Sequence, residues 1–300
     1  MEARNVADAG FGARIADDRR AVNDRLALLL PRADEEPASL HGAMRYATVD
    51  GGKRLRAILC LAGHRLCGDP RREAALEAGC AIECLHAYTL IHDDLPALDN
   101  DDIRRGKPSC HKAYGESVAI LAGDALLTLA FEIVARCGAP AEHALEAAGI
   151  LSRAAGSRYL VGGQVADLEG EGSEPTEERV RFIHSRKTAE LIGASLSIGA
   201  ALAGAERSKI EEMHEIGRSA GFAFQIIDDI IDLEGSAEKA GKALRKDEKK
   251  KKITYPAHFG IEISRETAGR LIADCARAIR ILGDDGYVKH IFSLMIERSS

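Results

Sequence analysis

The chain has 300 residues and a mass of 32.2 kDa, enough for one large domain or two small ones with a real apolar core. Its net charge of -6 and its pI of about 6.0 disfavour a protein that coats nucleic acid or binds a membrane surface, since both usually need a basic face. The longest uncharged apolar run, residues 191–205, is shorter than the roughly 20 residues that span a bilayer. The seven cysteines contain no CxxC pair and follow no secretory leader, so we expect reduced thiols and a cytoplasmic protein.

Apolar residues recur at steps of three and four along most of the chain, which predicts α-helices and no convincing strand. In chain order the clearest stretches are 19–30, 72–91, 118–137, 189–205 and 219–233. Several are apolar on almost every side, so other helices should cover them. No segment between them has the composition of a flexible linker. We therefore predict an all-α helix bundle that forms a single domain over residues 1–300.

The stretch "HAYTLIHDDLPALDN" carries a first acidic motif, DDxxxxD, made of Asp93, Asp94 and Asp99. Asp93 and Asp99 are six residues apart, about 240° around an ideal helix, so they can share a site only if the helix breaks between them. Pro96 is placed to break it. His86 lies seven residues before Asp93 on the same helical face, where it could donate to an anion, although a buried histidine is more often a core residue.

A second acidic motif, DDxxD, lies in "FQIIDDIIDL". Asp228 and Asp232 are one helical turn apart, Asp229 flanks them, and Gln225 lies one turn earlier on the same side. Carboxylates clustered in this way repel one another unless a cation lies between them, and all-oxygen ligands favour Mg²⁺ over zinc. A solvent-facing acidic stripe is the alternative. It is disfavoured because both motifs are embedded in apolar helices.

Basic residues in "DGGKRLRA", "IRRGKP" and "HSRKTAEL" indicate phosphate groups, which commonly complete the coordination of Mg²⁺. Arginine binds phosphate oxygens as a bidentate fork and lysine as a point charge. None of the three segments has the Walker pattern of a P-loop. Dispersed cations and two metal motifs predict more than one polyphosphate group. Since the helices between the carboxylates are apolar, the organic part of the substrate should be hydrocarbon.

Together these features resemble the short-chain trans-isoprenyl diphosphate synthases of the polyprenyl synthetase family, and most closely the bacterial branch that makes farnesyl diphosphate. The matching motifs run in family order from about residue 42 to residue 266: "GGKRLR", "HAYTLIHDDLPALDNDDIRRGKPSCHKAYGE", "LAGDALLTLAFE", "GGQVADL", "RKTAELI", "GFAFQIIDDIID" and "KITYPAHFGIE". The resemblance implies an isoprenoid synthase-type helix bundle around a deep central cavity, usually as a homodimer. It also implies Mg²⁺ as the cofactor, with three ions per active site.

The resemblance implies a prenyltransferase reaction between isopentenyl diphosphate and allylic diphosphates. Dimethylallyl and then geranyl diphosphate ionise to a carbocation, the double bond of isopentenyl diphosphate attacks it head to tail, and a proton is lost to give farnesyl diphosphate. An apolar pocket suits this chemistry because water would capture the cation. The departing diphosphate is expected to take the proton, so we expect no dedicated protein base.

The resemblance also assigns roles to individual positions. The metal ligands would be Asp93, Asp94, Asp99, Asp228, Asp229 and Asp232. Isopentenyl diphosphate would be bound by Lys53, Arg56, His86 and Arg105. The allylic diphosphate would be bound by Arg104, Lys187, Thr188, Gln225, Lys242 and Lys252. The residues expected to act in catalysis are Asp93, Asp94, Asp99, Arg104, Lys187 and Asp228. One departure from the family pattern is Arg245, at a position where glycine often stands.

Tyr88 and Thr89 are expected to control product length. Tyr88 lies five residues before Asp93, about 7.5 Å along a helix axis, and a bulky ring there should stop the growing chain early. Thr89 is small and adds little obstruction. By resemblance, an aromatic residue at position 88 accompanies the fifteen-carbon product, and a smaller one permits twenty carbons or more. The alternative is that Tyr88 is an ordinary core residue.

Three other functions share parts of this pattern. A geranylgeranyl diphosphate synthase would use the same mechanism with a different cavity floor. A terpene cyclase also ionises an allylic diphosphate, but it has no isopentenyl diphosphate site, and Lys53, Arg56 and His86 argue against it. A non-catalytic regulatory subunit of a prenyltransferase typically loses aspartates from the metal motifs, whereas both motifs are complete here.

Overall fold

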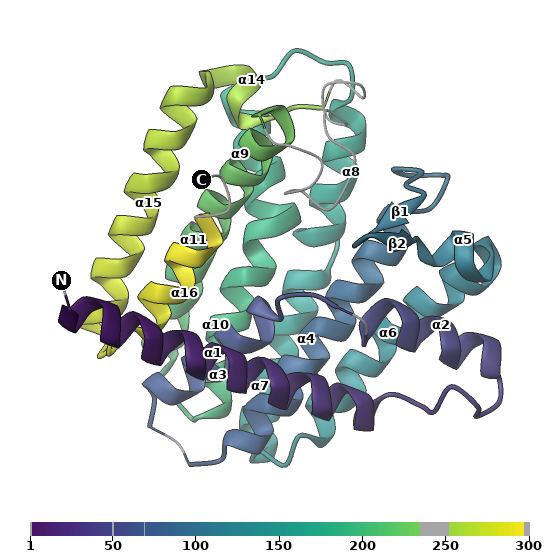
Figure 1. Ribbon diagram of the computed structural model, residues 1–300, viewed down its shortest axis with the longest axis horizontal. Helices are drawn as coiled ribbons and strands as arrows, with labels where there is room; N and C mark the ends of the chain where they lie inside the picture. Colours follow the sequence, from purple (N-terminus) through teal and green to yellow (C-terminus); the bar gives the residue numbers. More distant parts are fainter. Residues whose placement is uncertain (1, 50, 69, 235–251, 297–300) are drawn as a thin grey trace.

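The computed structural model describes residues 2–49, 51–68, 70–234 and 252–296 (Figure 1). Helices account for nearly all of the regular structure in these residues, which confirms the predicted all-α fold. In chain order they are α1 (Glu2–Leu29), α2 (Ala38–Thr48), α3 (Leu55–Leu66), α4 (Arg72–Asp93), α5 (Cys110–Tyr114), α6 (Glu116–Arg136), α7 (Ala141–Ala155), α8 (Leu160–Gly170), α9 (Glu177–His184), the π-helix η1 (Ser185–Ala189), α10 (Glu190–Leu202), α11 (Arg207–Glu234), α14 (Tyr255–Phe259), α15 (Ile261–Ile281) and α16 (Tyr287–Ile296).

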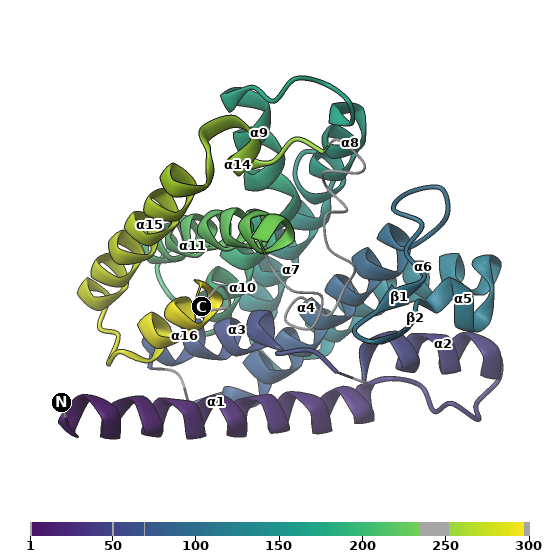
Figure 2. The ribbon, with the colours of Figure 1, turned by 45° about the horizontal axis from the view of Figure 1, so that its top comes forward.

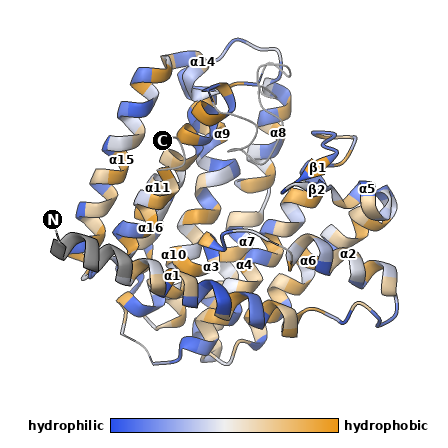
Figure 3. Cartoon of the chain, viewed as in Figure 1, coloured by the Kyte–Doolittle hydropathy of each residue, from blue (hydrophilic) through white to orange (hydrophobic). Residues whose placement is uncertain are grey.

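Helix α10 is the centre of the bundle, and every residue in it is buried. It packs against α3, α4, α7 and α11, as expected for a helix that is apolar on almost every side (Figure 3). Glycines allow α3 and α10 to approach closely. A Cβ at Gly199 would lie 2.0 Å from the carbonyl oxygen of Cys60, and one at Gly63 would lie 2.1 Å from that of Leu196. The two helices therefore pack backbone against backbone.

The two ends of the chain, which carry no motif, pack onto the same bundle. Helix α1 runs across one side of it (Figure 2). Asp18 of α1 is 2% exposed and accepts hydrogen bonds from Arg65 of α3, from Arg72 of α4 and from the Tyr287 hydroxyl of α16. Throughout the described part of the chain, the buried apolar side chains form one continuous cluster. One core therefore supports all the helices that surround the cavity described below.

A short hairpin is the main feature of the fold that the helical periodicity did not predict. Strands β1 (Ile103–Arg104) and β2 (Lys107–Pro108) pair antiparallel, with Ile103 opposite Pro108 and Arg104 opposite Lys107. Arg105 and Gly106 form the turn, and both have positive φ, 55° and 77°. This left-handed conformation at both central positions is the one that suits a two-residue hairpin turn. The hairpin carries Arg104 and Arg105 to the mouth of the cavity.

By length and hydropathy alone, α4 and α6 could each cross a membrane. The apolar window of α4 is 72% buried by other helices, so α4 is a core helix of the bundle. The window of α6 is only 39% buried, because Ile120 and Leu121 lie on its outer face. Helix α6 therefore presents an apolar face that the described residues leave uncovered.

Candidate active site

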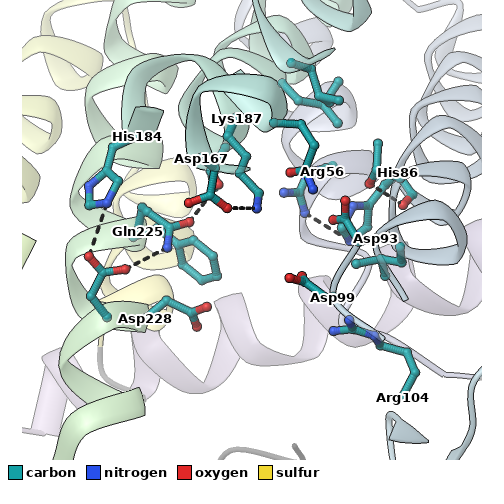
Figure 4. A pocket seen from close by; sticks show the side chains of 18 of the residues that line it. Arg56, His86, Asp93, Asp99, Arg104, Asp167, His184, Lys187, Gln225 and Asp228 are labelled. Carbon is teal, nitrogen blue, oxygen red and sulfur yellow. Dashed lines mark hydrogen bonds and ion pairs between the residues drawn. The ribbon is translucent and has the colours of Figure 1, made fainter. Parts of the chain in front are cut away.

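A cavity of about 640 Å³ opens between α3, α4, α8, η1 and α11. Two walls face each other in it (Figure 4), with Asp167, His184, Lys187, Gln225 and Asp228 on one and Arg56, His86, Asp93, Asp99 and Arg104 on the other. The predicted site residues that line the cavity are Lys53, Arg56, His86, Thr89, Asp93, Asp99, Arg104, Arg105, Lys187, Thr188, Gln225, Asp228, Asp229, Asp232 and Lys252. Asp94 and Tyr88 do not line it, and Lys242 lies outside the described residues.

The first acidic motif breaks as its spacing predicted. Helix α4 ends at Asp93, and the turn that follows contains Pro96. The backbone N–H of Asp99 donates to the carbonyl oxygen of Asp93 at 2.8 Å, which brings the two residues back together. Burial raises the pKa of Asp93, and Asp99 adds to the rise although Lys187 opposes it. A cation bound beside Asp93 would offset the cost of its charge in this environment.

Asp94 has a different role from its neighbour. It is 2% exposed and turned away from the cavity, and it accepts a bidentate hydrogen bond from Arg104, with Nε 3.0 and 3.1 Å from the two carboxylate oxygens. Arg104 also lies 3.5 Å from Asp101. Burial opposes the charge of Arg104, but Asp94 outweighs it and raises the pKa of the guanidinium. The Asp94 carboxylate thus holds Arg104 in place, and its predicted role as a metal ligand stays a prediction.

The second acidic motif lies on the unbroken helix α11, again as predicted. Asp228 is half-buried and lines the cavity. Asp229 is 3% exposed, and both of its carboxylate oxygens accept hydrogen bonds, one from Gln225 Nε2 at 2.9 Å and one from the backbone N–H of Tyr255 at 2.9 Å. Gln225 in turn accepts a hydrogen bond from the Thr188 hydroxyl at 2.6 Å. Asp229 thus ties α11 to η1 and to α14.

The predicted isopentenyl diphosphate residues bring three cations, Lys53, Arg56 and Arg105, to the cavity wall together with His86. Arg56 Nη1 lies 3.4 Å from His86 Nε2, so this ring nitrogen accepts from the guanidinium. Burial, and then Arg56 and Arg105, hold the pKa of His86 well below its usual range. Burial also lowers the pKa of Arg105, and Arg54 and Arg104 add to that effect. An anion bound here would relieve repulsion between these charges.

The carboxylates of the cavity suit Mg²⁺ that is completed by other ligands. Within the described residues, no three His, Cys, Asp or Glu side chains converge closely enough to hold a metal by themselves. Mg²⁺ usually keeps several waters or phosphate oxygens and takes one or two carboxylates from the protein. Asp93 and Asp99 on one wall and Asp228 on the other offer that kind of donor set. The site residues therefore fit Mg²⁺ together with a diphosphate.

Comparisons with known proteins agree with this geometry. The model of the polyprenyl synthetase family matches residues 37–295. The chain belongs to the polyprenyl synthetase family. A dimethylallyltranstransferase of Fischerella ambigua (strain UTEX 1903) is 48% identical over 246 residues, which cover 81% of this chain and 71% of the relative. Geranylgeranyl pyrophosphate synthase 4 of Arabidopsis thaliana is 42% identical over 269 residues, which cover 89% of this chain and 70% of the relative.

Solved structures place the fold in the same family. A geranyltransferase of Helicobacter pylori, complexed with magnesium and isoprenyl diphosphate, superposes with a TM-score of 0.84 at 28% identity and covers 95% of this chain and 96% of its own. The protein is therefore a prenyltransferase with the isoprenoid synthase helical fold, and its activity is that of a short-chain prenyl diphosphate synthase.

Asp167 of this prenyltransferase is a site residue that sequence reasoning missed. Lys187 Nζ lies 2.6 Å and Lys252 Nζ 3.1 Å from the same Asp167 oxygen, and Lys252 also lies 3.1 Å from Asp99. Burial opposes the charge of Asp167, but the two lysines outweigh it and lower its pKa. The motif "GGQVADL" marked the region, yet its spacing indicated no partner for the carboxylate. Asp167 thus pairs with both lysines, and all three residues line the cavity.

The π-helix η1 is a second feature that sequence reasoning missed. It contains Lys187 and Thr188, and its wider turn presents both to the cavity. A Cβ at Gly163 of α8 would lie 2.4 Å from the backbone nitrogen of Lys187, so only glycine allows this approach. Short π-helical turns are common at functional sites of helical proteins. His184, just before η1, lies 3.2 Å from the Asp229 carboxylate and completes this wall.

The two residues expected to control product length lie in different surroundings. Thr89 lines the cavity, and its hydroxyl donates to the carbonyl oxygen of His86. Tyr88 packs edge-on against His92, with ring centroids 4.9 Å apart. Burial raises the pKa of Tyr88, with Asp93 and then Asp124 adding to it. Tyr88 therefore lies beside the first acidic motif on the side that faces α6, and its role in product length stays a prediction.

Proposed function

We propose that this prenyltransferase condenses isopentenyl diphosphate with dimethylallyl and then geranyl diphosphate, in the presence of Mg²⁺, to give farnesyl diphosphate. The observation that carries the proposal is the pair of acidic motifs on opposite walls of one cavity, each flanked by cations. The magnesium and isoprenyl diphosphate of the Helicobacter pylori relative support both the cofactor and the substrate class. We include three Mg²⁺ ions per site, the number that the family resemblance implies.

Different side chains of the cavity would bind the metal and the two diphosphates. Asp93, Asp99, Asp228 and Asp232 would hold Mg²⁺, which when bound neutralises charge that builds on the departing diphosphate. Lys187 and Lys252, held by Asp167, would contact the same allylic diphosphate.

On the other side of the cavity, Lys53, Arg56, His86 and Arg105 would orient isopentenyl diphosphate so that its double bond faces the allylic carbon. Apolar lining residues would exclude water from the cation, namely Leu90, Leu160, Ile183, Leu191 and Phe224. No step requires a proton acceptor from the protein.

Geranylgeranyl diphosphate is the second candidate product. It is favoured by the similarity to a geranylgeranyl pyrophosphate synthase and by the position of Tyr88 outside the cavity lining. Incubation of the purified protein with isopentenyl diphosphate and geranyl diphosphate, with and without Mg²⁺, distinguishes the products by chain length. Magnesium-dependent fifteen-carbon product supports the proposal, and a twenty-carbon product favours the second candidate. Binding of the allylic diphosphate without condensation would contradict both.

We propose that two copies of the chain associate through the outer face of α6 and α7. Helices α6 and α7 pack side by side, and Ile120, Leu121 and Leu145 on them are 43%, 57% and 75% exposed. Exposed apolar residues on neighbouring helices are a feature of many protein interfaces. Light scattering should give the mass of a dimer. Leu121→Glu should give a monomer, whereas Leu28→Glu, at a 79% exposed position on α1, should leave the mass unchanged.

A further inference from the structure

The segment that connects α2 and α3 is anchored by the buried guanidinium of Arg54. Its side chain is 1% exposed, and its φ of 56° lies in the left-handed region although the residue is not glycine. Arg54 Nε donates to the side chain of Asn23 on α1 at 2.8 Å. Nη2 donates to the carbonyl oxygens of Thr48 and Val49 at 2.7 and 2.9 Å. Arg54 and Glu83 both border the cavity, but the Arg54 guanidinium is committed to contacts within the protein and fixes the end of α2.

Glu83 of α4 faces Arg54 from the other side. It is 4% exposed, and Oε2 lies 3.5 Å from Arg54 Nη1. Its other oxygen accepts a hydrogen bond of 3.4 Å from the backbone N–H of Ala57, in the first turn of α3. The N-cap residue of α3 is Arg54, which gives no side-chain cap, so Glu83 supplies the negative charge that a helix N-terminus favours. One carboxylate thus fixes both Arg54 and the start of α3.

The four residues assigned to isopentenyl diphosphate lie on, or contact, the two segments that this ion pair joins. Lys53 and Arg56 lie on either side of Arg54 in the sequence, and His86 lies one helical turn after Glu83 on α4. Arg105 reaches the same segment from the hairpin, because its Nη1 donates to the carbonyl oxygen of Gly51 at 3.2 Å.

Glycine is required where Arg105 crosses the segment. A Cβ at Gly52, which has a φ of 102°, would lie 3.1 Å from Arg105 Nη2. Arg56 and His86 contact each other across α3 and α4 (Figure 4). A shift of the segment would therefore move several ligands of one diphosphate at once.

We propose that the Arg54–Glu83 ion pair is the positioning element of the isopentenyl diphosphate site. It holds residues 51–56 against α4, so that the cations around it converge on one diphosphate while neither partner of the pair binds the substrate. The proposal rests on the proposed function, because it assigns a role within that site. It predicts a defect confined to one of the two substrates.

Arg54→Met tests this role, because methionine keeps an unbranched aliphatic stem but lacks the guanidinium and so loses its four polar contacts. We expect the KM for isopentenyl diphosphate to rise about tenfold or more, and the KM for geranyl diphosphate to change by less than about twofold. Arg25→Met is the matched control, since Arg25 also joins α1 to α4, through Glu73 and Glu77. It should lower stability without changing either KM. Equal rises in both KM values for Arg54→Met would overturn the proposal.

The double variant Arg54→Met with Glu83→Gln separates positioning from stability. Removing one partner of a buried pair leaves the other uncompensated, so the second change should recover part of the Tm lost in Arg54→Met. The KM of the double variant for isopentenyl diphosphate should stay as high as that of Arg54→Met. If this KM returned toward the wild-type value along with the Tm, the proposal would be contradicted. If Arg54→Met does not fold, Glu83→Gln alone tests the proposal. We then expect the KM for isopentenyl diphosphate to rise about threefold and the KM for geranyl diphosphate to stay unchanged.

A separate measurement distinguishes failure of this proposal from failure of the proposed function. If the wild-type protein does not condense the two diphosphates, the proposed function fails. Titration with inorganic diphosphate in the absence of Mg²⁺ then tests the positioning role alone. Wild type and Arg25→Met should bind it equally, and Arg54→Met should bind it about tenfold more weakly. Equal binding by all three would overturn the positioning role.

Discussion

The two acidic motifs of the cavity use their paired aspartates in the same way, although their backbones differ. In the first motif the helix ends at Asp93, and in the second α11 continues without a break through Asp228. In both, the first aspartate lines the cavity; Asp229 also borders it, whereas Asp94 does not. In both, the second aspartate, Asp94 or Asp229, is almost fully buried and binds a neighbouring element of the protein.

This division teaches that a run of carboxylates is not a uniform set of metal ligands. Asp94 holds Arg104 of the hairpin, and Asp229 holds Gln225 together with the backbone of Tyr255. Each second aspartate thus orients a group that faces the substrate. We expect substitutions at the first and second positions to have different effects, and the predictions below test that difference.

The largest effect is expected for Asp93→Ala and Asp228→Ala. Each removes a carboxylate that would hold Mg²⁺ against the departing diphosphate, so kcat should fall by about 10²–10³-fold or more. Steady-state rates at saturating Mg²⁺ measure this. Asp102→Ala is the control, since Asp102 belongs to the same acidic stretch but is exposed and pairs with Lys112. Near-normal rates for either cavity variant would remove that residue from the mechanism.

For Asp94→Asn, the main expected effect is on stability. Loss of the charge leaves the mostly buried Arg104 guanidinium with Asp101 at 3.5 Å in place of its closest ionic partner, which costs about 2 kcal/mol or more. The Tm should fall by several degrees in the absence of substrate. An unchanged Tm, together with a loss of Mg²⁺ affinity, would show that Asp94 is a metal ligand after all.

Much of this fold could be predicted from helical periodicity. The five predicted stretches lie in α1, α4, α6, α10 and α11, and the burial of α10 on all sides follows from its lack of a polar face. The hairpin β1–β2 was missed because two-residue strands are too short to show alternation. The turn at Arg105 and Gly106 gave a weak signal, since only one of its residues is glycine.

The site was predictable where the chemistry is local in sequence. The break between Asp93 and Asp99 follows from their angular separation on a helix and from Pro96, and the shared face of Asp228 and Gln225 follows from helical spacing. The partners of Asp94 and Asp167, and the Tyr255 partner of Asp229, were not predictable, because each lies on a different element from its carboxylate. Tertiary packing alone decides which carboxylate faces the cavity and which faces the protein.

Asp229→Asn should affect binding of the allylic substrate more than Mg²⁺ dependence. The carboxylate accepts hydrogen bonds from Gln225 and from the Tyr255 N–H with its two oxygens, whereas an asparagine amide has only one oxygen. Gln225 and Thr188 should therefore lose their orientation. We expect the KM for geranyl diphosphate to rise about tenfold, with the Mg²⁺ concentration for half-maximal rate unchanged. A shift in the Mg²⁺ requirement instead would place Asp229 among the ligands.

The smallest effect concerns the stability of the metal-free protein, where Asp93→Asn should act in the direction opposite to Asp94→Asn. Burial and Asp99 raise the pKa of Asp93 above its ordinary value of 3.8, so the folded state binds a proton here more readily than the unfolded state does. Stability is therefore lost as the pH rises from about 4 through that raised pKa, and the ionised carboxylate destabilises the fold at neutral pH. Asparagine removes this effect.

Calorimetry in EDTA should accordingly show a higher Tm for Asp93→Asn than for wild type at about pH 7, with the difference shrinking toward about pH 4 as the wild-type carboxyl becomes protonated in both states. Asp102→Asn, at an exposed carboxylate, should show no such trend. Ionised Asp93 destabilises the fold until a cation binds beside it. Mg²⁺ with inorganic diphosphate should therefore raise the Tm of wild type more than the Tm of Asp93→Asn. A lower Tm for Asp93→Asn in EDTA would mean that both aspartates of the pair stabilise the fold.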